Sequence, residues 1–178
     1  MSKVLAIDTS TSRTCVAIID GDEVLYNGHR DGATAHGPSL PQLVQEALAV
    51  SPVDEVVVGM GPGPFTGLRV GIAFARTFAL AREIPVRGVC SLDAIAAQVS
   101  DQDFIITVDA RRKEVYWARY TDGKRVSEPA VNFPADVSGA TIHSDLFPDM
   151  KALVQLTGDI SEPIYLRRPD AVATADRT

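Results

Sequence analysis

The stretch GPGPFTGLRVGIAFARTFALA, from Gly61 to Ala81, decides how this chain is interpreted. Its first half has the glycines of a phosphate-binding loop, and its second half is a helix that is apolar on almost every side. A helix of that kind is buried either within its own fold or against a partner. The stretch therefore sets two functions against each other, the binding of a nucleotide and the binding of another protein.

The loop lacks the defining features of the known phosphate loops. A Walker loop requires a lysine after its last glycine, and none is present here. A Rossmann loop requires G-x-G-x-x-G, and GPGPFTG is one residue too long. Pro62 and Pro64 also remove two backbone N–H donors, although proline is favoured in the first turn of a helix. The loop is therefore better suited to begin a helix than to hold a phosphate.

The helix has two ridges that suit close packing. The first ridge contains Gly67, Gly71, Ala75 and Ala79, and the second contains Val70, Phe74 and Phe78. Small residues at four-residue spacing let another helix approach closely. Each glycine inside a helix costs about 1 kcal/mol relative to alanine, so a packing contact should offset that cost. We expect one face to pack on the chain's own sheet and a second face, with these seven residues, to bind another protein.

Composition narrows the classes of function. The chain has 178 residues, 46% of them apolar, and a net charge of −6, which suits one domain or two small lobes. An acidic chain repels phosphate backbones, so we expect no unaided binding to nucleic acid. The start, MSKVLAIDTSTS, is not a signal peptide, and no apolar run approaches the ~18 residues of a membrane span. We predict a cytoplasmic protein with no membrane contact.

The apolar pattern predicts alternating strands and helices. We expect strands at 3–8, 15–20, 24–29, 53–60, 85–89, 103–110 and 114–120, and helices at 38–50, 65–81 and 91–100. Residues 127–158 have turn residues and one weak helix at 147–156, and the tail from 162 to 172 should be extended. Two hairpins share one form, a strand that ends in an aspartate (Asp8 or Asp109), a polar turn and a second strand. Duplication explains this likeness, but hairpins are common and the pattern leaves both explanations open.

The first hairpin turn is the better candidate for nucleotide chemistry. Asp8, Thr9, Ser10 and Thr11 bring an acid and hydroxyls to one turn, as in actin-like ATPases. The alternative is a Ser/Thr-rich turn that satisfies its own backbone. The second turn instead has Arg111, Arg112 and Lys113, which are either a solvated turn or a contact for tRNA positioned by a partner.

Metal chemistry has no motif in this sequence. The three histidines, His29, His36 and His143, form no H-E-x-x-H and no i, i+4 pair. His36 begins a predicted helix, where we expect a capping or interface role. We expect no metal and no cofactor.

Four motifs in order resemble the TsaB (YeaZ) family: LAIDTST, GPGPFTGLRVGIAFARTFAL, VDARRKEVYWARY and EPIYLRRPDA. The resemblance reaches from the first strand to the tail and is weak from Ser127 to Ser161, where family members are usually longer. It implies an α/β, actin-like (ASKHA, ribonuclease H-like) fold of two lobes, residues 1–98 and a shortened 99–178. It further implies a partner, TsaD, which transfers a threonylcarbamoyl group to N6 of the tRNA adenosine beside the anticodon.

The resemblance also implies how this chain would act. It would bind TsaD through helices of the first lobe, with TsaE joining the pair, and it would contact tRNA only indirectly. Where TsaD has V-N-H-L-E-[AG]-H, this chain has VCSLDAI, so Ser91 and Ile95 replace two metal-binding histidines. The expected role is a non-catalytic scaffold. The alternatives are a stand-alone actin-like ATPase or kinase, and a metalloprotease, which has no supporting residues. Without TsaD, the exposed apolar helix face should form a homodimer.

Overall fold

The computed structural model describes residues 2–32 and 34–167. The elements up to residue 96 are β1 (Lys3–Asp8), β2 (Arg13–Asp20), β3 (Glu23–Asp31), α1 (His36–Val50), β4 (Glu55–Gly59), α2 (Phe65–Arg82), β5 (Val86–Val89) and α3 (Ser91–Ala96). Those that follow are β6 (Asp103–Asp109), β7 (Val115–Thr121), β8 (Lys124–Arg125), β9 (Ala130–Asn132), the 3₁₀ turn η1 (Pro134–Asp136), β10 (Thr141–His143) and α4 (Met150–Gln155). They form two five-stranded sheets, one in each lobe.

The first sheet has the strand order β3-β2-β1-β4-β5. The strands β1, β2 and β3 are antiparallel neighbours, whereas β4 and β5 run parallel to β1. Strands β1 and β4 are almost wholly buried because helices cover both faces of the sheet, which explains their continuous apolar runs. This order is that of an actin-like, ribonuclease H-like lobe, so the predicted fold class is confirmed.

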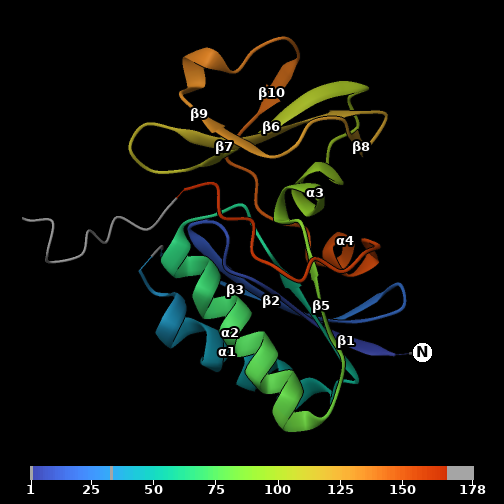
Figure 1. Cartoon of the computed structure of the whole chain (residues 1–178). Coiled ribbons are helices and arrows are strands. Elements are labelled where there is room, and N and C mark those ends of the chain that lie inside the picture. The colour runs from blue at the N-terminus through green and yellow to red at the C-terminus, as the bar shows by residue number, and fades with distance from the viewer. Residues whose placement is uncertain (1, 33, 168–178) are drawn as a thin grey trace, which may run out of the picture.

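The molecule is built in layers (Figure 1). Helices α1 and α2 cover one face of the first sheet, and a core that includes Leu5, Ile18 and Leu68 lies between these helices and the sheet. Helices α3 and α4 lie between the two sheets. A second core packs the first sheet on α4, and a third packs α3 on the second sheet. Among the described residues, no helix is long and apolar enough to cross a bilayer.

The second sheet repeats the first in a reduced form. Strands β6 and β7 form an antiparallel hairpin, β9 is antiparallel to β7, and β10 is parallel to β6. In this arrangement β6, β7, β9 and β10 correspond to β1, β2, β3 and β4 of the first sheet. Each hairpin turn contains the same type of hydrogen bond. Ser10 N donates to Asp8 Oδ1 in the first turn and Arg111 N donates to Asp109 Oδ1 in the second, each at 2.8 Å. This agreement supports duplication. Where the first lobe has α1 between its third and fourth strands, the second has only η1.

Residues 127–158 contain more structure than their sequence indicates. This segment contains the strands β9 and β10 in addition to the predicted helix, which is observed as α4. Helix α4 then returns to the first lobe and contacts β1, β2 and β4. Arg87 on β5 holds the C-terminal end of α4 in place by donating hydrogen bonds to the carbonyls of Val154 and Leu156 at 2.5 and 2.7 Å. The proposed domain boundary between residues 98 and 99 stays a prediction.

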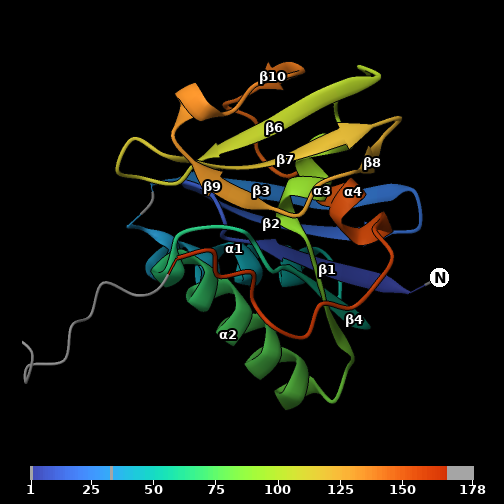
Figure 2. The same cartoon turned by 45° about the horizontal axis from the view of Figure 1, so that its top comes forward.

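Residues 156–167, here called the C-terminal strap, run from α4 along the first lobe to the second (Figure 2). Ile160 N donates to Gly88 O at 2.8 Å and Ile164 N donates to Met60 O at 2.9 Å. From 162 to 167 the strap has no helix or strand, as predicted, and residues 168–172 of the predicted extended tail lie outside the described residues. The strap therefore ties the edge of the first sheet to the loop before α2.

Candidate functional site

The turn between β1 and β2 is buried, and its side chains bond within the protein. Asp8, Thr9, Ser10 and Thr11 are all almost inaccessible to solvent. Asp8 Oδ1 accepts from Ser10 N at 2.8 Å and from Ser10 Oγ at 2.7 Å. Thr9 Oγ1 donates to the carbonyl of Gly67 at 2.8 Å. Thr11 Oγ1 accepts from the backbone N–H of Arg13 at 3.1 Å. The turn thus satisfies its own polar groups, which was the alternative to a nucleotide turn.

Ser91 completes the enclosure of Asp8. Its hydroxyl donates to Asp8 Oδ2 at 2.6 Å and accepts from Gly61 N at 3.2 Å. Burial raises the pKa of Asp8, although the hydrogen bonds from Ser91 and Ser10 oppose that shift. The position that the resemblance aligns with a metal-binding histidine of TsaD is therefore occupied by Ser91, which donates a hydrogen bond to the carboxyl group of Asp8.

The glycines around the turn are explained by close packing. A Cβ at Gly63 would overlap the backbone of Ser10, and one at Gly71 would overlap Thr9 Oγ1. A Cβ at Gly67 would lie 2.9 Å from the carbonyl oxygen of Thr9. The loop and the first turns of α2 therefore approach the β1–β2 turn at a distance that only glycine permits.

The expectation that the small-residue ridge faces outward is wrong. Gly67, Gly71, Ala75 and Ala79 are buried, and Ala75 has no exposed surface. They approach the protein's own β1–β2 turn, the first residue of α1 and the core on the first sheet, so the packing reason for the glycines lies inside the lobe. Sequence spacing shows that something packs closely on this ridge, but it does not show what packs there.

The neighbouring ridge lies at the edge of the core. Val70, Phe74 and Phe78 are partly buried against the core beneath α1 and α2. The rings of Phe74 and Phe78 stack with their centroids 6.1 Å apart. Each of the three still has exposed surface, so they remain candidates for contact with a partner.

His36 is an internal contact. Its ring is buried, its Nδ1 lies 2.8 Å from Thr14 Oγ1, and it packs beside Gly67. The N-cap residue of α1 is Ala35, so His36 is the first residue inside the helix and is not its cap. Burial lowers the pKa of His36, and the nearby Asp8 opposes that shift. The prediction that His36 caps the helix is wrong, and its burial also argues against direct contact with a partner.

The outer face of α2 was missed by the sequence analysis. Its exposed positions include Ala73, Thr77 and Leu80, and Leu80 is 80% exposed. These residues follow each other at helical spacing on the side opposite the small-residue ridge. The signal was available in the sequence, because a helix that is apolar all round must present two faces.

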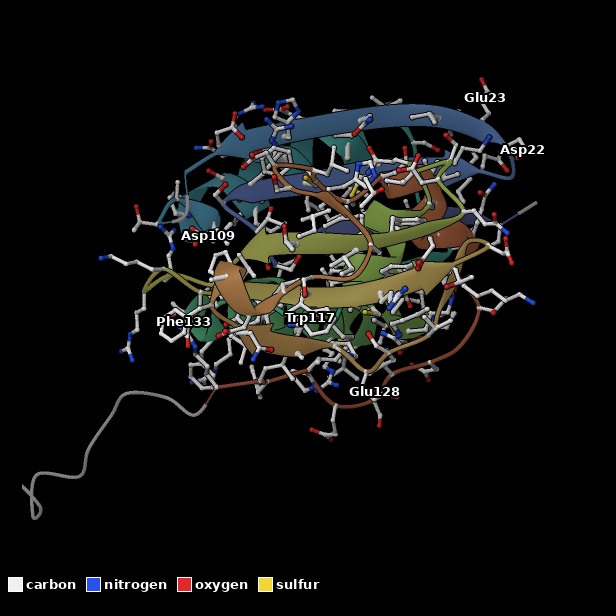
Figure 3. The ribbon with its side chains drawn as sticks, turned by 90° about the horizontal axis from the view of Figure 1, so that it is seen from above. Asp22, Glu23, Asp109, Trp117, Glu128 and Phe133 are labelled. Carbon is white, nitrogen blue, oxygen red and sulfur yellow. The ribbon has the colours of Figure 1, made fainter. Side chains whose placement is uncertain are left out.

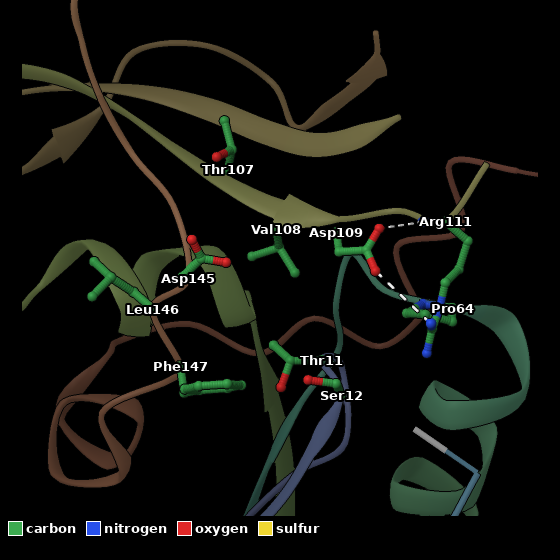
Figure 4. Close-up of a pocket in the computed structure, with 10 residues that line it drawn as sticks. All are labelled: Thr11, Ser12, Pro64, Thr107, Val108, Asp109, Arg111, Asp145, Leu146 and Phe147. Carbon is green, nitrogen blue, oxygen red and sulfur yellow. Dashed lines mark hydrogen bonds and ion pairs between the residues drawn. The ribbon is translucent and has the colours of Figure 1, made fainter. Parts of the chain in front are cut away.

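A small pocket separates the two hairpin turns (Figure 4). Thr11, Ser12 and Pro64 line it from the first lobe, and Asp109 and Arg111 line it from the second. Its volume is about 70 Å³, well below the ~300–1,000 Å³ of sites that hold a small organic ligand. The structure thus brings the two duplicated turns together but leaves little space between them.

The basic turn of the second lobe is exposed. Arg111, Arg112 and Lys113 have φ values of 62°, 55° and 64°, so three consecutive side chains leave a left-handed backbone. Arg111 NH1 lies 3.9 Å from Asp109 Oδ2.

Among the described residues, no three His, Cys, Asp or Glu side chains are placed to hold a metal ion.

The fold and the two facing turns define the class of protein: a two-lobe, actin-like protein whose first turn is filled by its own side chains. The family model described as "TsaD: tRNA N6-adenosine threonylcarbamoyltransferase" matches residues 30–169. A solved structure titled YeaZ from Pseudomonas aeruginosa superposes with a TM-score of 0.74 and 25% identity, covering 87% of this chain and 90% of its own.

Two sequence relatives extend this comparison. An uncharacterized protein of Mycobacterium tuberculosis is 43% identical over 96% of this chain and 94% of its own length. The Escherichia coli "tRNA threonylcarbamoyladenosine biosynthesis protein TsaB" is 34% identical over 66% of this chain. The match spans 54% of that protein, about half of its length. This chain belongs to the TsaD family and, within it, to the TsaB (YeaZ) group.

Proposed function

We propose that this protein acts in tRNA threonylcarbamoyladenosine biosynthesis as the non-catalytic partner of TsaD. Membership of the TsaB group supports the pathway, because the Escherichia coli and Bacillus subtilis relatives are named for it. TsaD transfers the threonylcarbamoyl group to tRNA, and this protein holds TsaD in a form that TsaE can join.

The filled β1–β2 turn is the observation that carries the non-catalytic role. Both oxygens of Asp8 accept hydrogen bonds inside the protein, from Ser10 and Ser91. A carboxylate that positions a metal or water needs a free oxygen facing an open site. The pocket of about 70 Å³ beside the turn is too small for a nucleotide. These features argue against the alternative of a stand-alone ATPase or kinase.

The outer face of α1 and α2 is the proposed surface for TsaD. It presents Ala73, Thr77 and Leu80 from α2 and Val50 from α1, and its only acidic residue on these helices is Glu46. Exposed apolar side chains with few acids suit a protein interface. Two helices from each partner could bury the ~1,200–2,000 Å² of a standard interface. Without TsaD, the same face would pair with a second copy.

We assign tRNA an indirect contact at most. The net charge of −6 disfavours unaided binding, which we expect to be no tighter than about 10⁻⁴ M at physiological salt. The exposed turn of Arg111, Arg112 and Lys113 could contact tRNA that the complex has already positioned. We propose no metal and no cofactor for this chain.

Reconstitution tests the proposal. TsaD, TsaE, threonylcarbamoyl-adenylate and tRNA are combined with and without this protein, and modified adenosine is measured. We expect modification only when this protein is present, and none from this protein alone. Modification at an equal rate without it would remove the proposed role. Turnover by the pure protein that disappears with Asp8→Ala would show that the chain is an enzyme.

A further inference from the structure

The small pocket between the two hairpin turns has an aromatic side chain at one end. Phe147 lies in the connection from β10 to α4, and it lines this pocket with Thr11 and Ser12 of the first lobe. Figure 4 shows Phe147 on one side of the pocket and Pro64 and Arg111 on the other. The contacts at these two ends decide whether the lobes can separate around the pocket.

At the first end, Arg13 of β2 is stacked on Phe147. The guanidinium carbon lies 3.9 Å from the centre of the ring, within the ~6 Å of a cation–π contact. Asp31 on β3 holds the guanidinium in place, because it accepts from Arg13 Nε at 2.7 Å and from Nη2 at 3.3 Å. A two-pronged pair of this kind fixes the plane of the guanidinium. The first lobe thus presents a rigid cationic surface to the ring.

The segment that carries Phe147 is fixed in its turn. Gln98, in the chain after α3, donates to the carbonyl of Phe147 at 2.7 Å. Leu146 packs against the core between α3 and the second sheet. Asp149 caps the start of α4 with its side chain. Phe147 is therefore anchored on both sides in the sequence, and its ring joins this anchored segment to Arg13.

The C-terminal strap closes the other end of the pocket. Tyr165 packs on Phe65, directly after the proline that lines the pocket, with the ring centroids 4.9 Å apart. Arg167 donates to the carbonyl of Ala110, directly after the aspartate of the second turn, at 2.8 Å. The strap thus joins the loop of the first lobe to the turn of the second lobe.

The two ends of the pocket are placed where they oppose a hinge motion. In two-lobed proteins, a hinge at a few residues lets the lobes open and close around a ligand. Helices α3 and α4 join the sheets toward the end opposite the two hairpin turns (Figure 1). A rotation about these helices would therefore separate the turns. Phe147 and the strap hold the lobes together on either side of the pocket and resist that rotation.

We propose that Phe147 and the C-terminal strap form a clamp that keeps the two lobes in one closed arrangement. The clamp holds the space between the turns at about 70 Å³ and so acts as an autoinhibitory contact, which keeps any nucleotide-sized ligand away from the first turn. This inference goes beyond the proposed role with TsaD and does not depend on it, because the clamp acts within the isolated chain and lies outside the outer face of α1 and α2.

Distances between labels on the two lobes test the clamp. Spin labels are attached through His29→Cys on β3 and Asp136→Cys in η1, two exposed positions. The native Cys15 and Cys90 are buried. Labelled protein is diluted with unlabelled protein, so that only distances within one chain are measured. We expect one narrow distribution of distances in the parent chain, unchanged by ATP and Mg²⁺.

Variants remove each end of the clamp. Phe147→Ala should raise the population with separated lobes about two- to fivefold, because a cation–π contact is lost. Arg167→Ala should also broaden the distribution, and the double variant should broaden it most. Phe133→Ala is the matched control, because Phe133 is an exposed aromatic residue on the outer surface of the second lobe (Figure 3). It should leave the distribution unchanged.

Circular dichroism and thermal melting confirm that each variant is folded. Phe147 is only partly buried, so its loss should not unfold the chain. If Phe147→Ala does not fold, Phe147→Leu takes its place alone and with Arg167→Ala, since it removes the aromatic face and keeps an apolar side chain. A parent distribution that is broad or has two peaks, a shift with ATP and Mg²⁺, or a double variant as narrow as the parent would overturn the proposal.

Discussion

Two alanines on α2, two positions apart, lie in opposite environments. Ala75 is fully buried in the core beneath the helix, and Ala73 is exposed. Ala75→Arg should unfold or severely destabilise the protein, because overpacking costs about 1–3 kcal/mol and an unpaired buried charge adds to it. Ala73→Arg should leave stability within about 0.5 kcal/mol and weaken association with TsaD. Thermal melting and co-purification with TsaD measure the two effects.

The sequence predicts Ala75 as one of seven residues of α2 that bind another protein, and on that prediction arginine at this position would block the partner and spare the fold. A variant with arginine at Ala75 that melts like the parent would mean that the ridge faces outward after all. Undiminished binding of TsaD to Ala73→Arg would place the interface on another surface.

His36 gives stability a dependence on pH. Burial lowers its pKa in the folded protein, so between that value and the ~6.5 of an unfolded chain the unfolded state binds more protons. Stability is therefore full above pH ~6.5 and falls as pH decreases toward the lowered pKa. His36→Gln should remove this part of the slope. Denaturant unfolding at about pH 7.5 and about pH 5.5 measures it.

The control for this prediction is His29→Gln, which removes an exposed imidazole from β3. It should leave the slope of the parent protein in place. If His36→Gln lost as much stability on acidification as the parent, the slope would have to come from other groups. Asp8 could not supply it, because burial raises its pKa and a raised carboxyl pKa stabilises the folded state as pH decreases.

At the scale of elements, α2 packs closely on the β1–β2 turn. Gly71→Ala should destabilise the protein by about 1–3 kcal/mol, because the new methyl group overlaps Thr9 Oγ1 and lies 3.2 Å from Thr9 Cγ2. Helix propensity alone predicts the opposite sign, a gain of about 1 kcal/mol. Thr9→Ala should make room, so the second substitution should cost less in that background. A double-mutant cycle of denaturant unfolding measures the coupling.

Gly37→Ala on α1 is the matched control, because no atom lies within 4 Å of its added Cβ. Its stability should be unchanged or raised by up to about 1 kcal/mol. Additive effects of Thr9→Ala and Gly71→Ala would mean that these two residues do not touch.

The elements that sequence predicts well are those with long, buried patterns. The runs in β1, β4 and β6, and the helical period of α1 and α2, follow from burial on one or both faces. Strands β9 and β10 have three residues each and are partly exposed, so no pattern marks them. The actin-like class was predictable because hairpin, helix and parallel strand follow in order.

The candidate site was only partly predictable, because its geometry depends on contacts between distant residues. The sequence indicates that Asp8 ends a strand before a hydroxyl-rich turn. It does not indicate that Ser91, 83 residues later, donates a hydrogen bond to Asp8, or that the glycines of α2 pack against Thr9. A small-residue ridge has the same spacing whether its partner is a turn of the same chain or another protein.

At the scale of the whole molecule, the C-terminal strap holds the two lobes together. The rings of Tyr165 and Phe65 lie 4.9 Å apart at the start of α2. Two residues later, Arg167 donates to the carbonyl of Ala110 at 2.8 Å and pairs with Glu114. The strap thus spans from the proposed TsaD-binding helix to the basic turn of the second lobe. The left-handed residues of that turn are costly, so contacts at both of its ends should be needed to keep it in place.

Arg167→Ala should therefore release the turn before it affects the first sheet. We expect faster amide hydrogen exchange at residues 110–114, unchanged exchange in β1 and β4, and a loss of about 1–2 kcal/mol, because a charged hydrogen bond is removed. Arg30→Ala, which removes an exposed pair with Glu46, should leave exchange in the turn unchanged. Equal exchange at 110–114 in the parent and Arg167→Ala would show that the turn is held by its own backbone, with Asp109 Oδ1 bound to Arg111 N as its main support. Faster exchange throughout both sheets would instead make Arg167 a general contributor to stability.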